Sequence, residues 1–478
     1  MAEPKPLVLD VDGTFLRTDM LFECFWAGLG KDPIAVLRAS LRHFTRPEVL
    51  KRQLGEIADL RVDLLPVNDA VVALAKTTQE AGREVILASA SDTPLVQALA
   101  EQHDLSPRIF ASTPEKNLKG AAKAEALVEA FGENGFDYAG NEAVDRAVWD
   151  HAAGAVIVGD LPVQSKELAT AGKTVTEVTG GWHKRDLLRA LRPHQWVKNA
   201  LLLVPLISAH SFDVITLLTV ILGIAAFSAA ASSIYIVNDL LDLEADRLHA
   251  TKHTRPFASG TVPIQIGMLA FLVLSTIALG VGFLINWGFF AVVAIYMTLS
   301  LAYSLRLKRL RWVDIATLAS LYTLRVVAGA LAVDVYVSGY LLVFIFPTFL
   351  CLGCVKRLTE VTLAKGDERL PGRGYGRLDR GDLLNVAILG AVGAVFVFFL
   401  YSFSLQALEL YPTQWLLWLA AVPLSLWMFR MVWLGYTGKQ DYDPIVFAMK
   451  DKMGIGLIMI MLAIMFYAAG LWAVWFGG

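Results

Sequence analysis

The chain has 478 residues and a formal net charge of −2, and 56% of its residues are apolar. Its mean hydropathy is +0.53. These values exclude an ordinary soluble protein of this length and indicate a protein that lies largely in a membrane. We expect no nucleic-acid partner.

The apolar residues are spread unevenly along the chain. Residues 1–180 are a normal globular mixture, whereas long apolar runs begin near Val197. We therefore predict a multi-domain protein with a first domain over 1–180 and an all-α membrane domain over 181–478. The chain opens without a basic stretch followed by an apolar core, so we expect no cleavable signal and a cytosolic first domain.

The first domain carries polar residues at the ends of strand-like runs. The sequence "PLVLDVDGTFLRTD" starts as an apolar strand and ends in an acidic motif, and "EVILASASD" is a second strand-like run. A helix opens in "NLKGAAKAEAL", and "FDYAGNEAVD" follows. In chain order, these segments supply Asp10, Asp12, Ser89, Lys123, Asn141 and Asp145.

This order of motifs resembles the haloacid dehalogenase superfamily of phosphatases. The resemblance implies an α/β, Rossmannoid domain in which Asp10 is the nucleophile that forms an aspartyl phosphate. Asp12 would protonate the leaving oxygen, and both aspartates would share a Mg²⁺ with the phosphate. Ser89 would be the second-motif hydroxyl, and Lys123 matches the third-motif lysine better than Lys119 does.

The fourth motif departs from the family's pattern. Where "GDxxxD" is usual, the chain reads "GNEAVD", so Asp145 is kept and Asn141 replaces the first carboxylate. Asn141 can still bind a metal through its carbonyl oxygen, but it brings no charge, so metal affinity should fall. An active phosphatase and a degenerate, inactive copy both stay open. The insert between Gly13 and Ser89 is rich in helix formers and predicts a small helical cap.

Nine apolar segments of roughly membrane-crossing length follow. We predict them at 196–210, 214–237, 263–285, 288–304, 313–333, 338–355, 383–405, 413–435 and 453–475. Lys and Arg gather in the connections after the second, fourth, sixth and eighth segments, and the intervening connections carry none. We therefore expect a multi-pass protein of the inner (plasma) membrane. The charged connections and the first domain would lie in the cytosol, and the C-terminus would lie on the extracytoplasmic side.

The second predicted span is followed by the acidic sequence "NDLLDLEADR". If the helix continues, Asp239, Asp242 and Asp246 fall within about 60° of one another, while Glu244 points away. A divalent cation would relieve the repulsion between these carboxylates, and oxygen ligands favour a hard ion such as Mg²⁺. The alternative is a solvated helix end that marks the membrane interface.

A basic cluster comes next, in "LHATKHTRP". Lys252, His253 and Arg255 supply cations for phosphate oxygens that the metal does not cover, and an arginine can bind a phosphate in bidentate fashion.

The pattern "NDxxDxxxD", the sequence "RPFASG" and the nine predicted spans resemble the UbiA-type intramembrane prenyltransferases. In that family the first aspartate-rich motif binds Mg²⁺ and a diphosphate, and a second motif, usually "DxxxD", completes the site. Carried over, the first set is Asn238, Asp239, Asp242 and Asp246.

The second motif departs from this pattern. The loop after the fourth predicted span offers only Asp314, with Leu318 where a second carboxylate would stand. It also carries Tyr303 and Lys308, a hydroxyl and a cation suited to a phosphate or a sugar phosphate.

Three further strings, "LRPHQWVKN", "KRLTEV" and "DPIVFAMKD", are similar to one branch of the family, the decaprenyl-phosphate phosphoribosyltransferases of actinobacterial wall synthesis. The resemblance implies that 5-phosphoribose moves from Mg²⁺-bound phosphoribosyl diphosphate to a polyprenyl phosphate at the cytosolic membrane face. Lys198, inside "QWVKN", is a candidate phosphate contact.

Two other functions stay open. A conventional member of the family would move a prenyl group from a prenyl diphosphate to an aromatic acceptor. Alternatively, the spans serve only as an anchor or scaffold for a phosphatase. In the phosphoribosyltransferase interpretation, the fused domain would remove the 5-phosphate that the product keeps on its ribose.

Arg325 lies midway along the fifth predicted span, where a charge usually faces a cavity or a partner. It follows Asp314 by eleven residues, which returns to within about 20° of the same helix face. Two interpretations stay open: a cation for the prenyl phosphate, or a buried arginine that binds carbonyls or pairs with a carboxylate.

Overall fold

The computed structural model describes residues 4–335, 338–364, 366, 369, 370, 373–440 and 443–476. The chain divides into two compact units. The first runs to Leu191 and adds Tyr235–Phe271, whereas the second holds Arg192–Ile234 and the chain from Leu272 onward. The aspartate-rich segment therefore belongs to the same unit as the N-terminal domain.

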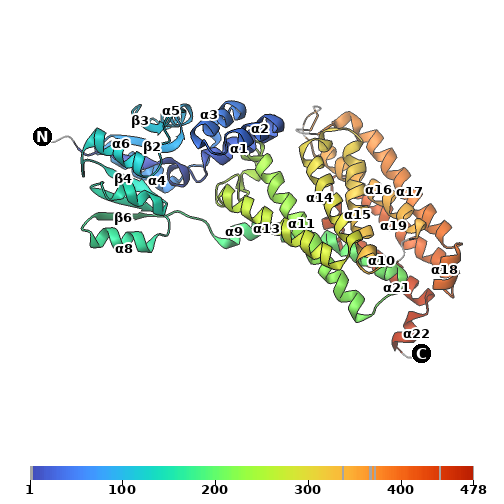
Figure 1. The fold of residues 1–478 in the computed structure, drawn as a ribbon. Helices are drawn as coiled ribbons and strands as arrows, with labels where there is room; N and C mark the ends of the chain where they lie inside the picture. Colours follow the sequence, from blue (N-terminus) through green and yellow to red (C-terminus); the bar gives the residue numbers. More distant parts are fainter. Residues whose placement is uncertain are drawn as a thin grey trace. The chain divides into compact units, whose positions relative to one another are not determined.

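The N-terminal domain is built on a parallel sheet, drawn in Figure 1, with the strand order β3-β2-β1-β4-β5-β6. The strands are β1 (Leu7–Asp10), β2 (Val85–Asp92), β3 (Ile109–Ser112), β4 (Asp137–Gly140), β5 (Gly154–Val158) and β6 (Thr174–Val178). The helices of this unit are α1 (Met20–Lys31), α2 (Pro33–Arg42), α3 (Pro47–Ala58), α4 (Asp69–Glu80), α5 (Thr93–Gln102), α6 (Ala121–Phe131), α7 (Arg146–Trp149), α8 (Pro162–Thr170), α9 (Lys184–Ala190) and α12 (Leu243–Arg247).

Helices cover both faces of the sheet because alternate residues of each strand point to opposite sides. Leu7 and Leu9 share one core with residues of α4 and α5, whereas Val8 shares another with residues of α6, α7 and α8. This three-layer arrangement confirms the predicted α/β domain. The insert between β1 and β2 contains α1, α2 and α3, whose core includes Cys24 and Leu54.

A buried ion pair holds the aspartate-rich segment to the N-terminal domain. Arg247 in α12 donates two hydrogen bonds to the carboxylate of Glu23 in α1, at 2.6 and 3.1 Å. The two side chains are only 8% and 1% exposed. Thr18 also donates to Glu23, and Arg247 donates to the carbonyl of Ala258, so both charged groups have several partners. Sequence spacing gives no sign of this pair.

Seven helices in the described part of the chain are long and apolar enough to cross a membrane. They are α11 (Val214–Leu241), α13 (Ile264–Ile285), α14 (Trp287–Leu305), α15 (Val313–Ala332), α16 (Gly339–Leu363), α17 (Arg380–Tyr401), preceded by a 3₁₀ turn η7 (Arg377–Asp379), and α19 (Trp415–Tyr436). The shorter elements are the 3₁₀ helices η4 (Pro193–Leu203), η5 (Lys252–Thr254) and η6 (Leu307–Arg309), and the helices α10 (Val204–Ala209), α18 (Leu405–Leu410), α20 (Pro444–Ala448), α21 (Lys452–Ala468) and α22 (Leu471–Phe476).

The predicted count of nine spans is not confirmed. The segment predicted at 196–210 forms η4 and the six-residue α10, and the last predicted span is divided between α21 and α22. Gly470, with φ +73°, lies between these two helices, and a left-handed glycine commonly ends a helix. A count of apolar residues does not detect such breaks.

The core of the second unit lies where α15, α16, α17 and α19 pack together. Small residues let these elements approach closely, as is usual in membrane helix packing. A Cβ added to Gly329 in α15 would lie 2.1 Å from the carbonyl oxygen of Leu202 in η4. The short η4 is therefore packed tightly against a span.

We predict that Arg247→Met loosens the contact between α1 and α12. Glu23 would then be buried without its cation, which typically costs about 3–5 kcal/mol. Amide hydrogen exchange in 20–31 and 243–247 should therefore accelerate by about two to three orders of magnitude. The matched control is Arg61→Gln, which removes an exposed pair with Asp63 whose side chains are 49% and 40% exposed. Equal exchange in the two variants would contradict the role given to the buried pair.

Candidate functional site

The first acidic site lies at the carboxyl ends of the central strands. Asp10 ends β1, which lies between β2 and β4. The chain connects outward in both directions from this strand, and ligands in open α/β sheets bind at such a position. Lys123 donates to Asp10 at 2.5 Å, and both side chains are nearly buried. Burial raises the pKa of Asp10 to about 7, with Lys123 opposing the shift and the nearby acidic groups adding to it.

Asp12 is fixed by three donors. Its carboxylate accepts hydrogen bonds from the backbone N–H of Met20 at 2.8 Å, from Ser91 at 2.8 Å and from Ser89 at 3.1 Å. The structure thus brings the predicted Asp12 and Ser89 together. Ser91 was missed by sequence reasoning, although it follows Ser89 at the two-residue spacing that puts both side chains on one face of a strand.

Asn141 lies against the first motif. Its carbonyl oxygen accepts a hydrogen bond from Thr14 at 2.9 Å. Gly13 has φ +76°, a conformation in which other residues are strained, and a Cβ there would lie 2.4 Å from the Asn141 amide nitrogen. Asp145 accepts from the backbone N–H groups of Asn141 and Glu142.

A further chain of hydrogen bonds connects Lys123, the partner of Asp10, to Asp145. Lys123 donates to the hydroxyl of Tyr138 at 3.0 Å, and that hydroxyl donates to Asp145 at 3.0 Å. Tyr138 is buried within β4 and was not predicted. Asp10 and Asp12 belong to the first motif, and hydrogen bonds connect Asn141 and Asp145 to it. All four proposed metal ligands therefore offer oxygen atoms suited to Mg²⁺.

The second acidic site lies where α11 ends. Asp239 and Asp246 both accept from the same nitrogen of Arg255, at 3.1 and 2.6 Å, and both residues are only 2% exposed. Burial raises the pKa of Asp246, and Arg255 opposes the shift. Two buried carboxylates thus share one cationic group.

The helix does not continue through the motif as assumed from the sequence. It breaks at Asp242, which has φ −102° and ψ 15° and precedes α12. The break still leaves Asp239 and Asp246 on one side, as their common partner Arg255 shows. Asp242 is half-buried, and Glu244 is exposed, in agreement with its predicted outward direction.

The rest of this segment is more open. Asn238 is half-buried near the end of α11, and Lys252 and His253 are exposed in η5. Within the described residues, no group of three or more His, Cys, Asp or Glu side chains is gathered as a metal cluster. The oxygen donors of Asp239 and Asp246 nevertheless fit a hard cation, since they already converge on a positive charge.

A third charged cluster lies in the second unit, around Asp314. Arg357 in α16 donates two hydrogen bonds to the Asp314 carboxylate, at 2.5 and 3.1 Å, and both side chains are fully buried. Tyr303 donates to the same carboxylate at 2.8 Å, and Arg373 donates to the Tyr303 hydroxyl at 3.2 Å. Arg357 also binds Glu360. The predicted Tyr303 and Asp314 therefore meet, while Lys308 is half-buried in η6.

Arg357 and Arg373 were not predicted. Arg357 lies in the string "KRLTEV", but nothing in the spacing of that string indicates that Asp314, 43 residues earlier, is its partner.

The buried Lys198 forms an ion pair with the half-buried Asp443. Asp443 also caps the N-terminus of α20 by accepting from the backbone N–H groups of Ile445 and Val446. Burial disfavours the charged carboxylate, yet Lys198 and Lys356 lower the pKa of Asp443 to about 2. The predicted Lys198 is thus held in place by a residue from the string "DPIVFAMKD".

Arg325 is buried inside the second unit. It donates to the amide oxygen of Asn199 at 3.0 Å, to the carbonyl of Leu321 at 2.7 Å and to the hydroxyl of Tyr296 at 2.9 Å. Its guanidinium also lies over the rings of Phe227, Tyr296 and Tyr322. These contacts agree with the second of the two interpretations, a buried arginine that binds a carbonyl.

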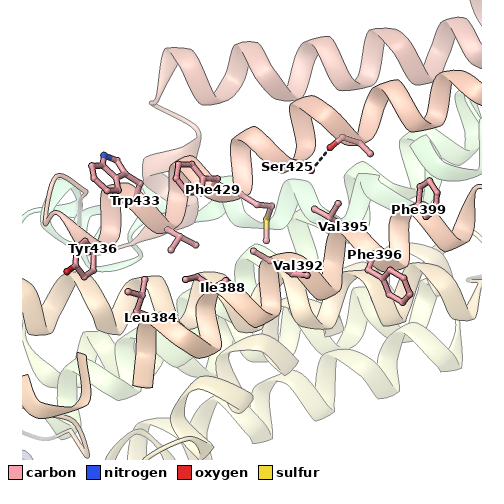
Figure 2. A pocket seen from close by; sticks show the side chains of 14 residues that line it. Leu384, Ile388, Val392, Val395, Phe396, Phe399, Ser425, Phe429, Trp433 and Tyr436 are labelled. Atoms are coloured by element: carbon pink, nitrogen blue, oxygen red, sulfur yellow. Dashed lines mark hydrogen bonds between the residues drawn. The ribbon is translucent and has the colours of Figure 1, made fainter. Parts of the chain in front are cut away.

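An apolar groove of about 640 Å³ runs between α17 and α19. Figure 2 shows side chains of the two helices facing each other across it. Its lining includes Ile388, Val392, Phe396, Phe429 and Trp433. The hydroxyl of Ser425 donates to a carbonyl of its own helix. Such a lining suits a hydrocarbon chain better than water.

Comparisons with known proteins agree with this architecture. The model of the UbiA prenyltransferase family matches residues 200–450. The chain is 33% identical over 453 residues to the uncharacterized protein y4nM of Sinorhizobium fredii, covering 94% of this chain and 88% of that protein. It is 29% identical over 272 residues to the decaprenyl-phosphate phosphoribosyltransferase of Mycobacterium tuberculosis, covering 56% of this chain and 88% of that enzyme.

Two solved structures are also similar. One is a UbiA homolog from Archaeoglobus fulgidus bound to GPP and Mg²⁺, with 16% identity, a TM-score of 0.46 and coverage of 60% of this chain and 99% of that chain. The other is a HAD family hydrolase from Salmonella enterica serovar Typhi, with 16% identity, a TM-score of 0.27 and coverage of 34% and 66%. Because the family model matches more than half of the chain, this multi-pass membrane protein belongs to the UbiA prenyltransferase family.

Proposed function

We propose that the chain transfers 5-phosphoribose from phosphoribosyl diphosphate to a polyprenyl phosphate at the cytosolic membrane face, with release of diphosphate. The observation that carries the proposal is the pair of buried carboxylates, Asp239 and Asp246, around one guanidinium at the end of α11. An inert anchor has no need of buried acids at this place. The similarity to a phosphoribosyltransferase supports the choice of donor.

The residues that would hold Mg²⁺ are Asp239, Asp242 and Asp246. They offer oxygen donors, and two of them already share a positive charge. When bound, the ion would neutralise charge on the departing diphosphate. Arg255 would then exchange a carboxylate for a phosphate oxygen, which a guanidinium binds in bidentate fashion. Lys252, exposed in the same segment, would add a second cation.

The proposed reaction breaks the bond between the ribose anomeric carbon and the diphosphate oxygen, and diphosphate leaves with the electron pair. An oxygen of the polyprenyl phosphate forms the new bond to the same carbon. The acceptor oxygen is already anionic near neutral pH, so no general base is required. Arg255 and Lys252 would stabilise the charge that develops on the leaving group.

The contacts of Asp314 agree with the predicted departure of this loop from the family's usual second motif. Its carboxylate is neutralised by Arg357 in a bidentate pair. Asp314 therefore serves first as a counter-ion that fixes Arg357 and Tyr303. Substrate contacts for Lys198, Tyr303, Lys308 and Asp314 stay proposals.

For the N-terminal domain, we propose removal of the 5-phosphate from the transferase product. An oxygen of Asp10 would attack phosphorus, and the ribose oxygen would leave with a proton from Asp12. Water would then hydrolyse the aspartyl phosphate. The pairing of Asp10 with Lys123 and the fixed position of Asp12 support this proposal. The similarity to y4nM also extends over 94% of this chain and is therefore not limited to the membrane domain.

The donor can be identified by diphosphate release. The full chain in lipid nanodiscs would receive Mg²⁺ with either phosphoribosyl diphosphate and polyprenyl phosphate, or prenyl diphosphate and an aromatic acid. We expect release only from the first pair. Release from the second pair alone would establish a conventional prenyltransferase instead, and release from neither would favour the anchor interpretation.

We predict that Asp239→Asn and Asp246→Asn each lower the rate of diphosphate release by about 100-fold or more, because charge stabilisation by a metal is worth several kcal/mol. The matched control is Glu244→Gln, since Glu244 lies in the same short helix as Asp246 but is exposed. This control should keep the wild-type rate. Equal losses in all three variants would show that general charge near the motif, rather than the buried pair, matters.

We predict that Asp10→Asn leaves the 5-phosphate on the lipid product, whereas the wild-type chain removes it. Mass spectrometry of the extracted lipid distinguishes the two products. Asn141→Asp should increase 5-phosphate removal at limiting Mg²⁺, because it restores a charged ligand. Asp69→Asn, at an exposed position of the same domain, is the control. Identical lipids from wild type and Asp10→Asn would rule out the phosphatase role.

A further inference from the structure

Helix α2 carries an apolar surface that the core of its own domain does not use. Ile34, Leu37 and Leu41 are 69%, 53% and 83% exposed, and Phe44, just after the helix, is 81% exposed. At 100° per residue, the three helical positions fall within about 60° of one another. Single exposed apolar residues are common, but a contiguous group on one face marks an interaction site.

The opposite face of α2 already has its partners. Val36 and Ala39 are buried. Val36 packs closely against Gly28, since a Cβ added to Gly28 would lie 2.8 Å from the Val36 side chain. The buried face therefore fixes α2 to its domain, and the exposed face is a separate surface. We call Ile34, Leu37, Leu41 and Phe44 the apolar face of α2.

Basic residues flank the apolar face. Arg38 and Arg42 are exposed and fall about 40° and 80° from Ile34, on one side of it. The only acidic residue between Lys31 and Arg46 is Asp32, which caps the helix N-terminus. An apolar face bordered by arginines is typical of helices that lie in the headgroup region of anionic membranes.

The insert that holds α1, α2 and α3, which is the predicted helical cap, contacts both spans that border the aspartate-rich segment. An added Cβ at Gly30, three residues before α2, would lie 3.8 Å from the carbonyl oxygen of Leu241, where α11 ends. Gln265, at the start of α13, donates to Asp19 at the start of α1. Within this unit, α2 therefore begins beside the end of a span, at the level where a membrane surface must lie.

We propose that α2 is an interfacial helix whose apolar face inserts into the anionic leaflet in which α11 ends, with Arg38 and Arg42 on lipid phosphates. A lipid surface fits this position and this charge better than a second protein does. The inference does not depend on the chemistry of either acidic site.

This anchoring would have a consequence for the N-terminal domain. Lys51 in α3 donates to the carbonyl of Ala90 in β2 at 2.6 Å, so the cap also lies over the strand that carries Ser89. A cap held in the headgroup region would keep the Asp10 site close to the lipid surface, where a lipid-linked phosphate ester would be found.

The test is a depth measurement on the full chain in nanodiscs that each hold one molecule. A nitroxide would be attached at Leu41→Cys and, as the comparator, at Val163→Cys, which is an exposed position of α8 in the same domain. The native Cys24, Cys351 and Cys354 are buried. Collision rates would be measured with oxygen, which concentrates in lipid, and with a water-soluble nickel chelate.

In discs of phosphatidylcholine mixed with phosphatidylglycerol, we expect the label at 41 to collide with oxygen and to be shielded from nickel, and the label at 163 to show the reverse. Low collision rates with both reagents at 41 would mean that a protein surface covers α2, and a high nickel rate would mean that it faces water. Either result overturns the proposal.

Two charge-reversal variants test the role of the arginines. Arg38→Glu and Arg42→Glu, each combined with the label at 41, should lower the lipid-inserted population by about fivefold or more in anionic discs. The effect should shrink in discs of phosphatidylcholine alone. A nickel rate that is unchanged by both substitutions in anionic discs would contradict binding of lipid phosphates by these arginines.

Discussion

Buried carboxylates at the ends of membrane helices must be paired with cations, because an isolated buried charge costs far more than the fold can supply. Within the described residues, several such pairs are found. Asp239 and Asp246 share Arg255, Asp314 is held by Arg357, and the half-buried Asp443 is paired with Lys198. Burying such pairs adds little to stability, since desolvation offsets their attraction.

The pairs also explain how an irregular segment keeps a defined shape. The aspartate-rich segment breaks its helix at Asp242 and continues through a short helix and a 3₁₀ turn. Arg255 reaches back to Asp239 and Asp246 from the far end of this segment, and Arg247 fixes its middle to Glu23. Two arginines thus determine the position of the loop, one by joining it to itself and the other by joining it to the N-terminal domain. The N-terminal domain therefore contributes to the structure of the aspartate-rich segment as well as carrying an acidic cluster of its own.

Much of this was predictable where one local pattern decides the structure. The apolar strands with Asp10 and Ser89 near their ends predict a parallel α/β domain, and the sheet confirms it. The long apolar runs predict membrane helices. Sequence reasoning was less successful at 196–210, where composition matches a span but the chain forms η4 and α10. The partners of the buried charges could not be predicted, because Arg357 and Asp314, or Glu23 and Arg247, are brought together only by tertiary packing. Helical periodicity placed Asp239 and Asp246 on one side, although the helix that it assumed is broken between them.

The central claim is that the carboxylates now held by Arg255 can instead hold a divalent cation while the arginine binds a phosphate. Anomalous scattering from crystals grown with Mn²⁺ and diphosphate tests it most directly. The account predicts a manganese peak within bonding distance of Asp239 and Asp246, with Arg255 turned onto the diphosphate. Arg255 still bridging the two carboxylates, with manganese bound elsewhere or diphosphate held without it, would contradict the account.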